Sequence, residues 1–485
     1  MENRKTAMKR TMLVIHANTY FTGLLPVAIS IKKSGKYEPR FLFCGNYPTL
    51  PNELERCRQE RLSFHANSTV ANSTAKILLR KMPVFILSSL RYIKIIIARV
   101  VFNNSIIQTL LLYGRIKFYR QFINEQGISL VILPADNRYD QAAIVKAAHN
   151  EEIPVVVIPQ FMASALEWAE FVWEKREYSA RSWANRFACS LFPRWGYVHK
   201  GRRLIALPAS QVFAREWLGI APPLPWILHS GHADALAVES EAVRDYCIAE
   251  GLPPEKIKVT GSSTHDIISA IIPKLADKRL ELYADLSLPD DRPMILSALP
   301  PDSLYMGRPQ CEFRKYDDLI EFWCRSLAAI KSFNIVICLH PSETVQKIKY
   351  IERFGVKIAK EPTYELIPLC NIFVASISST IQWAIACGKP VVNYDVYRYR
   401  YTDYVNVEGV ISIEDKSEYT NTLQRLTSDA EYCAEMTARQ SVHANRWGRL
   451  DGRAGDRLMQ LFDDLINQYT NRSEGGGNLE DGSAS

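Results

Sequence analysis

The chain has 485 residues, 47% apolar and 23% charged, a composition that supplies cores for two domains, or three small ones, and excludes a disordered protein. The ten cysteines include no Cys-x-x-Cys pair, which disfavours a zinc site and a disulfide framework and indicates a reduced, cytosolic setting. The net charge of +7 fits an anionic partner, such as a nucleotide or a phospholipid surface.

Residues 1–230 predict an α/β domain with a doubly wound sheet. Apolar runs of strand length alternate there with helical segments, and such runs suit parallel strands buried on both faces. His16 follows the first of these strands and Asp136 follows another, at carboxyl ends where open α/β sheets bind ligands. Either residue is a candidate general base, although an Asp after a strand is also a common helix cap.

Two segments of this first domain depart from the strand–helix rhythm. Residues 84–102 are apolar and place three cations on one helical face, which predicts either a helix on an anionic bilayer or a core helix with a solvated stripe. Residues 165–228 interleave six Trp with Arg, as in an insertion that meets a membrane, a lipid-linked acceptor or single-stranded nucleic acid; plain packing is the alternative. Peripheral contact with the inner face of a membrane is therefore one expectation.

The strand expected at 372–375 ends in a polar loop that contains Ser378, Ser379 and Thr380 and leads into a helix. Hydroxyls, free backbone N–H groups and the positive end of a helix dipole meet in such a loop. The loop therefore predicts a phosphate site, and a plain helix cap is the alternative.

Three other places are expected to complete this site. The apolar run before His340 and Pro341 predicts a neighbouring strand, from which His340 would add a donor, unless it is a structural histidine. Gly261 and Ser262 end another strand, and a glycine there lets a phosphate or sugar approach the backbone closely. Glu361 and Tyr364 are expected to line the base and ribose of a nucleotide.

The second domain is expected over residues 231–470, including closing helices. Residues 471–485 are rich in Gly, Ser and Asn and are expected to be a disordered tail.

Several segments resemble one superfamily of sugar enzymes. Residues 257–266 (IKVTGSSTHD) and 372–392 (IFVASISSTIQWAIACGKPVV) resemble the C-terminal domain of the UDP-N-acetylglucosamine 2-epimerase-like GT-B superfamily. The pair of His340-Pro341 with Ser378-Ser379 is similar to the HP and SS motifs of bacterial sialyltransferases and Kdo transferases, which use CMP-sugars. Residues 447–454 (WGRLDGRA) resemble C-terminal segments of surface-polysaccharide transferases.

The resemblance implies a GT-B fold, with two Rossmann-like domains facing a central cleft. It also implies a glycosyltransferase, which is expected in the cytoplasm. A single base that activates an acceptor hydroxyl gives direct displacement, so inversion at the anomeric centre is expected. This scheme needs no metal or cofactor, and no clustered carboxylates indicate a metal. The enzyme would move a sugar, such as Kdo or a sialic-acid-like sugar, from CMP to a glycan or lipid-linked glycan of lipopolysaccharide or capsule. The C-terminal domain would hold the nucleotide-sugar, and Asp136 or His16 would be the base; nucleic acid is not expected as a partner.

The sequence departs from each related enzyme in part. Epimerases carry a glutamate where this chain has Gln160, and their His-Arg-x-Glu-Asn motif is replaced by residues 297–300 (SALP). Glycerophosphotransferases that use CDP-glycerol usually show Asp-Tyr-Ser-Ser where residues 376–379 read SISS. The acidic motif of bacterial sialyltransferases has only Asp136 as a positional candidate. An epimerase, a glycerophosphotransferase and a non-catalytic protein that binds nucleic acid or membrane remain the alternatives.

Overall fold

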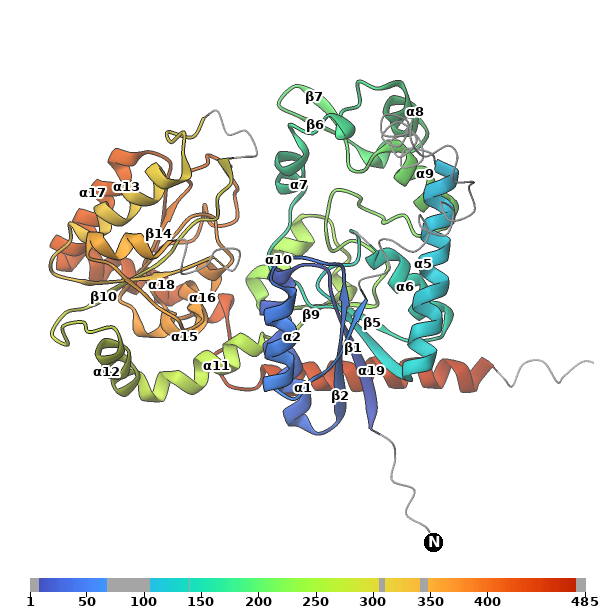
Figure 1. Cartoon of the computed structure of the whole chain (residues 1–485), viewed down its shortest axis with the longest axis horizontal. Coiled ribbons are helices and arrows are strands. Elements are labelled where there is room, and N and C mark those ends of the chain that lie inside the picture. Colours follow the sequence, from blue (N-terminus) through green and yellow to red (C-terminus); the bar gives the residue numbers. More distant parts are fainter. Residues whose placement is uncertain (1–7, 68–104, 139, 305–309, 341–347, 477–485) are drawn as a thin grey trace, which may run out of the picture. The chain divides into compact units, whose positions relative to one another are not determined.

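The structure is a computed structural model that describes residues 8–67, 105–138, 140–304, 310–340 and 348–476 (Figure 1). The chain forms two units. Unit 1 comprises Met1–Ala237, Cys247–Lys258 and Leu458–Ser485, and unit 2 comprises Val238–Tyr246 and Val259–Arg457. The helix predicted at 84–102 and Pro341 lie outside the described residues.

Unit 1 is built on a seven-stranded sheet with the strand order β3-β2-β1-β4-β5-β8-β9. Its strands are β1 (Lys9–Ile15), β2 (Tyr37–Cys44), β3 (Ser63–Asn67), β4 (Ile128–Leu133), β5 (Val155–Val157), β8 (Ala235–Val238) and β9 (Ile257–Val259). The chain winds outward from β1 to β3 and then returns to place β4 on the other side of β1, in parallel pairing. This reversal is the topological switch point of the sheet, where doubly wound folds bind ligands.

Helices cover this sheet, and most of them alternate with its strands along the chain. They are α1 (Asn18–Ser34), α2 (Leu50–Gln59), α5 (Ser105–Gln126), α6 (Gln141–Asn150) and α19 (Ala454–Gly476), while α10 (Glu241–Ala249) is divided between the two units. In the part of the chain that the structure describes, none of the helices has both the length and the apolar character that a transmembrane span needs.

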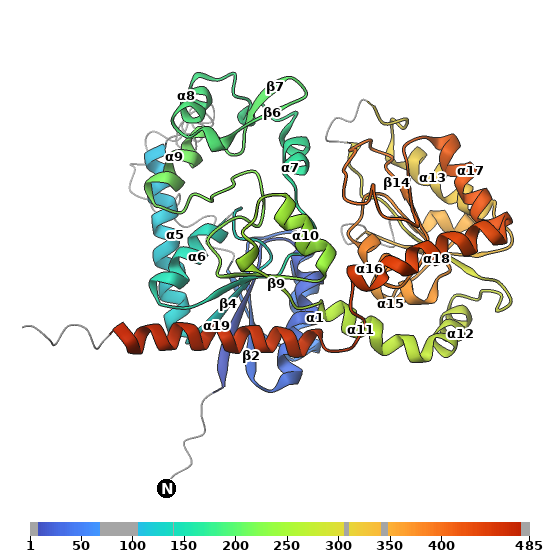
Figure 2. The ribbon, with the colours of Figure 1, turned by 180° about the vertical axis from the view of Figure 1, so that it is seen from behind.

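The domain boundaries expected from the sequence are wrong in two places. Strands β8 and β9 extend the first sheet, although they lie beyond residue 230. From Leu458 onward α19 also belongs to unit 1, because its apolar stripe, which includes Phe462 and Ile466, packs into the core of the first sheet (Figure 2). Residues 471–476, expected in a disordered tail, are the last turns of this helix.

The insertion at 165–228 has a small core of its own. It contains α7 (Ala165–Val172), α8 (Trp183–Leu191), β6 (Gly196–His199), β7 (Arg202–Ile205) and α9 (Ala209–Trp217), drawn in green in Figure 1. Trp195 and Trp226 are buried in this core, whereas Trp183 and Trp217 are exposed. Packing therefore explains only some of the tryptophans of the insertion.

Unit 2 is built on a six-stranded parallel sheet with the order β12-β11-β10-β13-β14-β15. Its strands are β10 (Met294–Ala298), β11 (Asn334–Cys338), β12 (Lys357–Ile358), β13 (Ile372–Ala375), β14 (Val391–Tyr394) and β15 (Val410–Ile413). Its helices are α11 (Ser263–Ile271), α12 (Leu275–Asp285), α13 (Tyr316–Ala328), α15 (Thr363–Leu366), α16 (Thr380–Ala386), α17 (Lys416–Ser428) and α18 (Ala430–Trp447). The chain reverses between β10 and β13, so the switch point of this sheet lies between these two strands.

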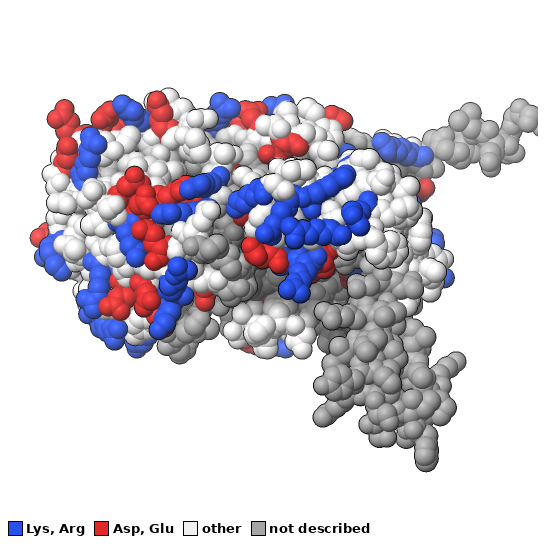
Figure 3. Space-filling model, turned by 90° about the horizontal axis from the view of Figure 1, so that it is seen from above, with Lys and Arg blue, Asp and Glu red and all other residues white. Residues whose placement is uncertain are grey.

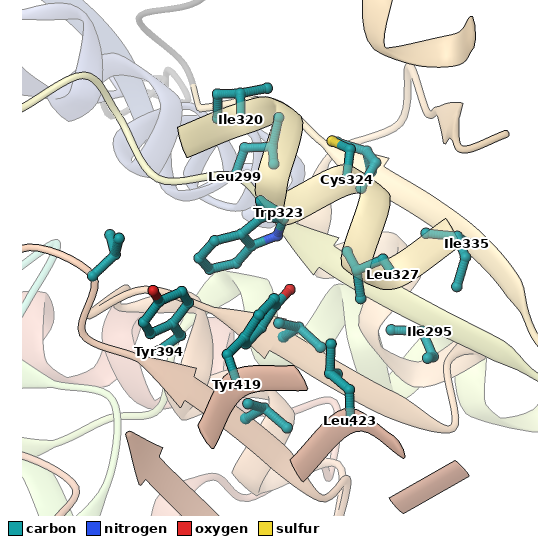
Figure 4. Close-up of a cluster of buried hydrophobic side chains, with 14 of the residues drawn as sticks. Ile295, Leu299, Ile320, Trp323, Cys324, Leu327, Ile335, Tyr394, Tyr419 and Leu423 are labelled. Atoms are coloured by element: carbon teal, nitrogen blue, oxygen red, sulfur yellow. The ribbon is translucent and has the colours of Figure 1, made fainter. Parts of the chain in front are cut away.

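A stack of large rings fills the core of unit 2 (Figure 4). The Tyr394 ring lies 4.7 Å from the Tyr419 ring and 5.5 Å from the Trp323 ring, nearly parallel to both. Trp323 satisfies its indole N–H by donating to Ser297 Oγ at 2.8 Å. Among the described residues the buried Tyr419 hydroxyl has no hydrogen-bond partner, and such a group costs free energy on burial.

Removing that hydroxyl is therefore expected to stabilise the protein. Tyr419→Phe should raise the free energy of unfolding by about 1 kcal/mol, measured by urea denaturation. Tyr283→Phe is the matched control, because the buried Tyr283 hydroxyl donates to the Arg292 carbonyl oxygen at 3.0 Å, and its loss should destabilise by a similar amount. Equal effects of the two substitutions would contradict the prediction.

Candidate functional site

The loop from Ser376 to Thr380 lies at the switch point of the second sheet and is held in an unusual backbone conformation. Ile377 has a φ of +44°, which is strained for a β-branched residue. Its N–H donates to Oδ1 of the buried Asn393 at 2.9 Å, and Asn393 Nδ2 donates to Ser412 Oγ at 3.2 Å. The ends of β14 and β15 therefore fix the shape of this serine loop.

The loop brings several hydroxyls together in front of α16. Ser378 Oγ lies 2.8 Å from Thr380 Oγ1 and accepts from the Thr380 N–H at 3.3 Å. Ser379 is at the N-cap position but makes no side-chain capping bond, and Ser376 Oγ is buried without a partner among the described residues. The Tyr404 hydroxyl donates to the Ser378 carbonyl oxygen at 3.2 Å. The structure thus brings Ser378, Ser379 and Thr380 together, and their hydroxyls can donate to an anion.

His340 does not lie on a strand next to the serine loop, so that expectation is wrong. It follows β11, and β10 lies between β11 and β13. Strands are about 4.8 Å apart, so the two strand ends are separated by roughly 10 Å. His340 and the serine loop still lie at the same carboxyl edge of the sheet, on either side of the end of β10. An extended nucleotide could contact both of them. The sequence does not reveal this order because it carries no direct signal of strand pairing.

Gly261 and Ser262 have local structural roles that explain their residue types. Gly261 has a φ of +82°, and a Cβ atom there would lie 2.8 Å from Ala454 Cβ. Ser262 caps α11, since its Oγ accepts from the Thr264 N–H at 3.2 Å. Both residues follow β9, a strand of the first sheet, although they belong to unit 2.

Tyr364 lies beside Trp383, which contacts Glu239; neither of these two was identified as a site residue from the sequence. Its ring is 5.8 Å from the Trp383 ring on α16, and Trp383 Nε1 donates to Glu239 Oε2 at 3.4 Å. Glu361, by contrast, accepts from the Lys360 N–H at 3.1 Å, after the edge strand β12. Glu239 follows β8. Its position at the carboxyl end of a strand is the sequence feature that could have identified it as a candidate site residue.

The surroundings of Glu239 perturb its ionisation. Burial raises its pKa from 4.5 to about 7, opposed by the Trp383 hydrogen bond. The neighbouring imidazole of His265 is fully buried, and burial lowers its pKa to about 4, so it is neutral at pH 7. The 3.7 Å separation of His265 Nε2 and Glu239 Oε2 is therefore a contact with a neutral ring. Perturbed carboxyl groups of this kind cluster at functional sites.

Glu239→Gln is expected to stabilise the protein at high pH and to have a smaller effect at low pH. The native carboxyl holds its proton more tightly than the unfolded one, so ionisation costs stability as the pH rises from 4.5 through about 7. The wild type should lose up to about 3 kcal/mol relative to the variant between about pH 5 and pH 8. Urea denaturation at both pH values measures this difference, with the exposed Glu431→Gln as the control. If the difference in stability between Glu239→Gln and the wild type were the same at both pH values, the prediction would be contradicted.

The two candidate bases flank the switch point of the first sheet, after β1 and β4. Asp136 is 2% exposed, and its oxygens accept from the N–H groups of Gly231 at 2.8 Å and Ala233 at 3.1 Å. Burial raises its pKa, and these backbone hydrogen bonds oppose the rise. Asp136 also lines a largely apolar cavity of about 200 Å³ within unit 1. Its hydrogen bonds show that Asp136 ties the 231–233 loop to the end of β4.

His16 has surroundings of a different kind. Burial lowers its pKa to about 4, while the Asp140 carboxylate raises it and the Arg115 guanidinium lowers it. Asp140 pairs with Arg115 and accepts a hydrogen bond from the Tyr119 hydroxyl at 3.0 Å. A neutral imidazole at pH 7 is in the protonation state that a general base requires.

Gln160 stands where the resemblance to epimerases implies a glutamate. Its Nε2 donates to the Ile158 carbonyl oxygen at 2.9 Å, and its side chain fills the space where a Cβ atom of Gly23 would be. The side chain therefore packs against α1, and an amide cannot act as a carboxylate base.

Known structures share this fold at low sequence identity. The S. aureus MnaA–UDP co-structure matches with a TM-score of 0.51 and 13% identity, over 95% of this chain and 97% of that chain. The calicheamicin glycosyltransferase CalG4 matches with a TM-score of 0.52 and 9% identity, over 96% and 99%. No family model and no curated protein sequence matches the chain. The similarity shows that the chain has the GT-B fold, with two Rossmann-like domains, as the sequence predicted.

Proposed function

We propose that the protein is an inverting, metal-independent glycosyltransferase that moves a sugar from a nucleotide donor to a surface glycan or glycolipid. A CMP-sugar, such as CMP-Kdo or a CMP-linked sialic-acid-like sugar, is the favoured donor. The observation that carries the proposal is the serine loop, which Asn393 holds in a strained turn at the switch point of the second sheet. Strained backbone that the surrounding structure over-determines is concentrated at ligand sites.

The donor phosphate would bind to the hydroxyls of Ser378, Ser379 and Thr380, with His340 donating from the other side of the β10 end. As the bond between the anomeric carbon and the phosphate oxygen breaks, negative charge develops on the departing nucleotide. Hydrogen-bond donors already aimed at that charge lower the barrier. Because α16 is only seven residues long, we assign this role to the hydroxyls and N–H groups more than to its dipole.

The first domain would bind the acceptor and supply the base. We favour His16 over Asp136, because both oxygens of Asp136 already accept backbone hydrogen bonds. The base takes the proton of the acceptor hydroxyl while that oxygen bonds to the anomeric carbon and the nucleotide leaves. A single displacement of this kind inverts the configuration at the anomeric carbon.

Isothermal titration with CMP, CDP and UDP tests the donor. CMP should bind most tightly, and Ser379→Ala or His340→Ala should weaken it about tenfold or more, since each removes a hydrogen bond to a charged phosphate. The matched control is Ser428→Ala at the exposed C-terminal end of α17, near the opposite edge of the sheet. Equal binding by Ser379→Ala and the wild type would remove the serine loop from the site.

Two alternative enzymes make different predictions in the same assay. A glycerophosphotransferase would consume CDP-glycerol, and a hydrolysing epimerase would turn over UDP-N-acetylglucosamine without an acceptor. The side chain of Gln160, packed against α1, disfavours the epimerase. If the protein consumed CDP-glycerol, or turned over UDP-N-acetylglucosamine without an acceptor, the corresponding alternative would replace the proposed glycosyltransferase.

A further inference from the structure

Helix α8 of the insertion exposes an apolar stripe to solvent. Trp183, Phe187 and Leu191 are 76%, 53% and 52% exposed, and their spacing of four residues places them along one face of the helix. The other face carries Ala188 and Cys189, which are fully buried in the core of the insertion. The helix is therefore apolar on both sides, and only one side is covered.

The stripe continues onto α9. The Phe187 ring lies 6.0 Å from the Phe213 ring, which lies 5.7 Å from the ring of Trp217. Trp217 is 58% exposed. We call Trp183, Phe187, Leu191 and Trp217 the aromatic patch. Contiguous exposed apolar surface of this kind marks an interaction site more often than scattered single residues do.

The aromatic patch is held rigidly. Ser182 caps α8 by accepting from the Asn185 N–H at 3.3 Å. The buried Asn185 side chain donates to the carbonyl oxygens of Glu177 at 3.0 Å and Ser179 at 2.8 Å, and accepts from the Ala209 N–H at 3.0 Å. One amide thus joins α8, α9 and the segment before α8, so the exposed rings are presented by an ordered scaffold.

Cations border the aromatic patch. Residues 165–228 contain nine Lys or Arg and five Glu, a net charge of +4 within a chain of +7. Arg181 and Arg186 are exposed and have no carboxylate partner among the described residues. The Ala180 N–H donates to the Arg203 carbonyl oxygen at 3.0 Å, which places Arg181 beside the β6–β7 hairpin. Figure 3 views the molecule from above and shows Lys and Arg side chains gathered together, with Asp and Glu beside them.

We propose that the aromatic patch and its arginine border dock unit 1 on an anionic phospholipid bilayer. Trp and Phe would enter the headgroup region, and Arg181, Arg186 and Arg203 would contact lipid phosphates. Charge complementarity selects this partner, because a second copy of the chain would present the same positive border. Single-stranded nucleic acid is disfavoured, since its sites interleave stacking rings with cations, whereas the α8 stripe is continuous and includes the aliphatic Leu191.

Vesicle flotation with the full chain tests the proposal independently of the proposed glycosyl transfer, because no nucleotide-sugar is needed. The wild type should float with vesicles of phosphatidylcholine and phosphatidylglycerol and remain unbound with phosphatidylcholine alone. Arg181→Glu with Arg186→Glu should lower the bound fraction at least about tenfold. Lys33→Glu with Lys349→Glu, at exposed positions outside the insertion, makes the same change of charge and should leave binding intact.

A second pair of variants tests the apolar contribution. Trp183→Ser with Phe187→Ser should also abolish flotation, with a thermal unfolding midpoint close to the wild type because both side chains are largely exposed. Leu280→Ser with Val442→Ser, at exposed positions of unit 2, is the control and should float normally. The proposal would be overturned if the wild type bound neutral and anionic vesicles equally, or if both insertion variants floated like the wild type. It would also be overturned if the chain formed a dimer that the Trp183 and Phe187 changes dissociate.

Discussion

His16→Ala is expected to lower kcat for sugar transfer by about 10²–10⁴-fold, the usual contribution of a positioned general base. His16 directly follows β1 at the switch point of the first sheet and is neutral at pH 7. Initial rates with saturating donor and acceptor measure the loss. His149→Ala is the matched control. His149 lies in the last turn of α6, at the opposite edge of the sheet, where its Nε2 lies 3.1 Å from Asp234 Oδ2, so the change should affect stability more than kcat.

The pH profile distinguishes a catalytic His16 from a structural one. Since burial lowers its pKa to about 4, a base at this position remains neutral down to low pH. The kcat/KM of the wild type should therefore stay level from pH 7 downward and fall only near pH 4, where the imidazole gains a proton. A fall centred on the ordinary histidine value of about 6.5 would contradict the assignment.

Asp136 makes a contrasting prediction at the same switch point. In Asp136→Asn the amide nitrogen would face the N–H of Gly231 or Ala233, so the variant should lose about 1–3 kcal/mol of stability. Any activity that it loses should follow the folded fraction. Full folding of Asp136→Asn with no activity would instead make Asp136 the base.

The local patterns of the sequence predicted more than its long-range pairings. The apolar runs of β11 and β13 and the polar loop after β13 could be read directly, because strand burial and turn chemistry are local. The sheet to which β8 and β9 belong could not, since any buried strand has the same composition. The return of α19 to unit 1 depends on its apolar stripe fitting a core formed more than 400 residues earlier in the chain.

The candidate site shows the same limit. Ser378 and Thr380 are close in sequence, and the structure brings them within hydrogen-bonding distance. His340 was expected on the next strand, but the chain forms β12 beyond β11 before it returns to β13 on the other side of β10. Asn393 and Glu239 were missed in the sequence because their hydrogen-bond partners are brought near them only by the fold. Asn393 accepts from the backbone N–H of Ile377, and Glu239 accepts from the indole N–H of Trp383.

Asn393→Ala is expected to weaken CMP binding by about 10–100-fold, which would be measured by isothermal titration. Without the Oδ1 acceptor, the N–H of Ile377 loses its partner, and a β-branched residue leaves the left-handed region at a gain of about 1–2 kcal/mol. The backbone then turns Ser378, Ser379 and Thr380 away from their arrangement. Losing one hydrogen bond to a charged phosphate, worth about 1.5–3 kcal/mol, gives a loss of this size.

Asn371→Ala is the matched control, because Asn371 Oδ1 also accepts a backbone N–H, that of Met294, at 3.0 Å. It lies just before β13, at the opposite edge of the same sheet, so both variants should lose about 1 kcal/mol of stability while only Asn393→Ala loses nucleotide. Adding Ile377→Gly to Asn393→Ala should restore part of the affinity, since glycine adopts a positive φ without strain. If the double variant binds no better than Asn393→Ala, the strained turn does not position the hydroxyls, and Asn393 acts only by stabilising the fold.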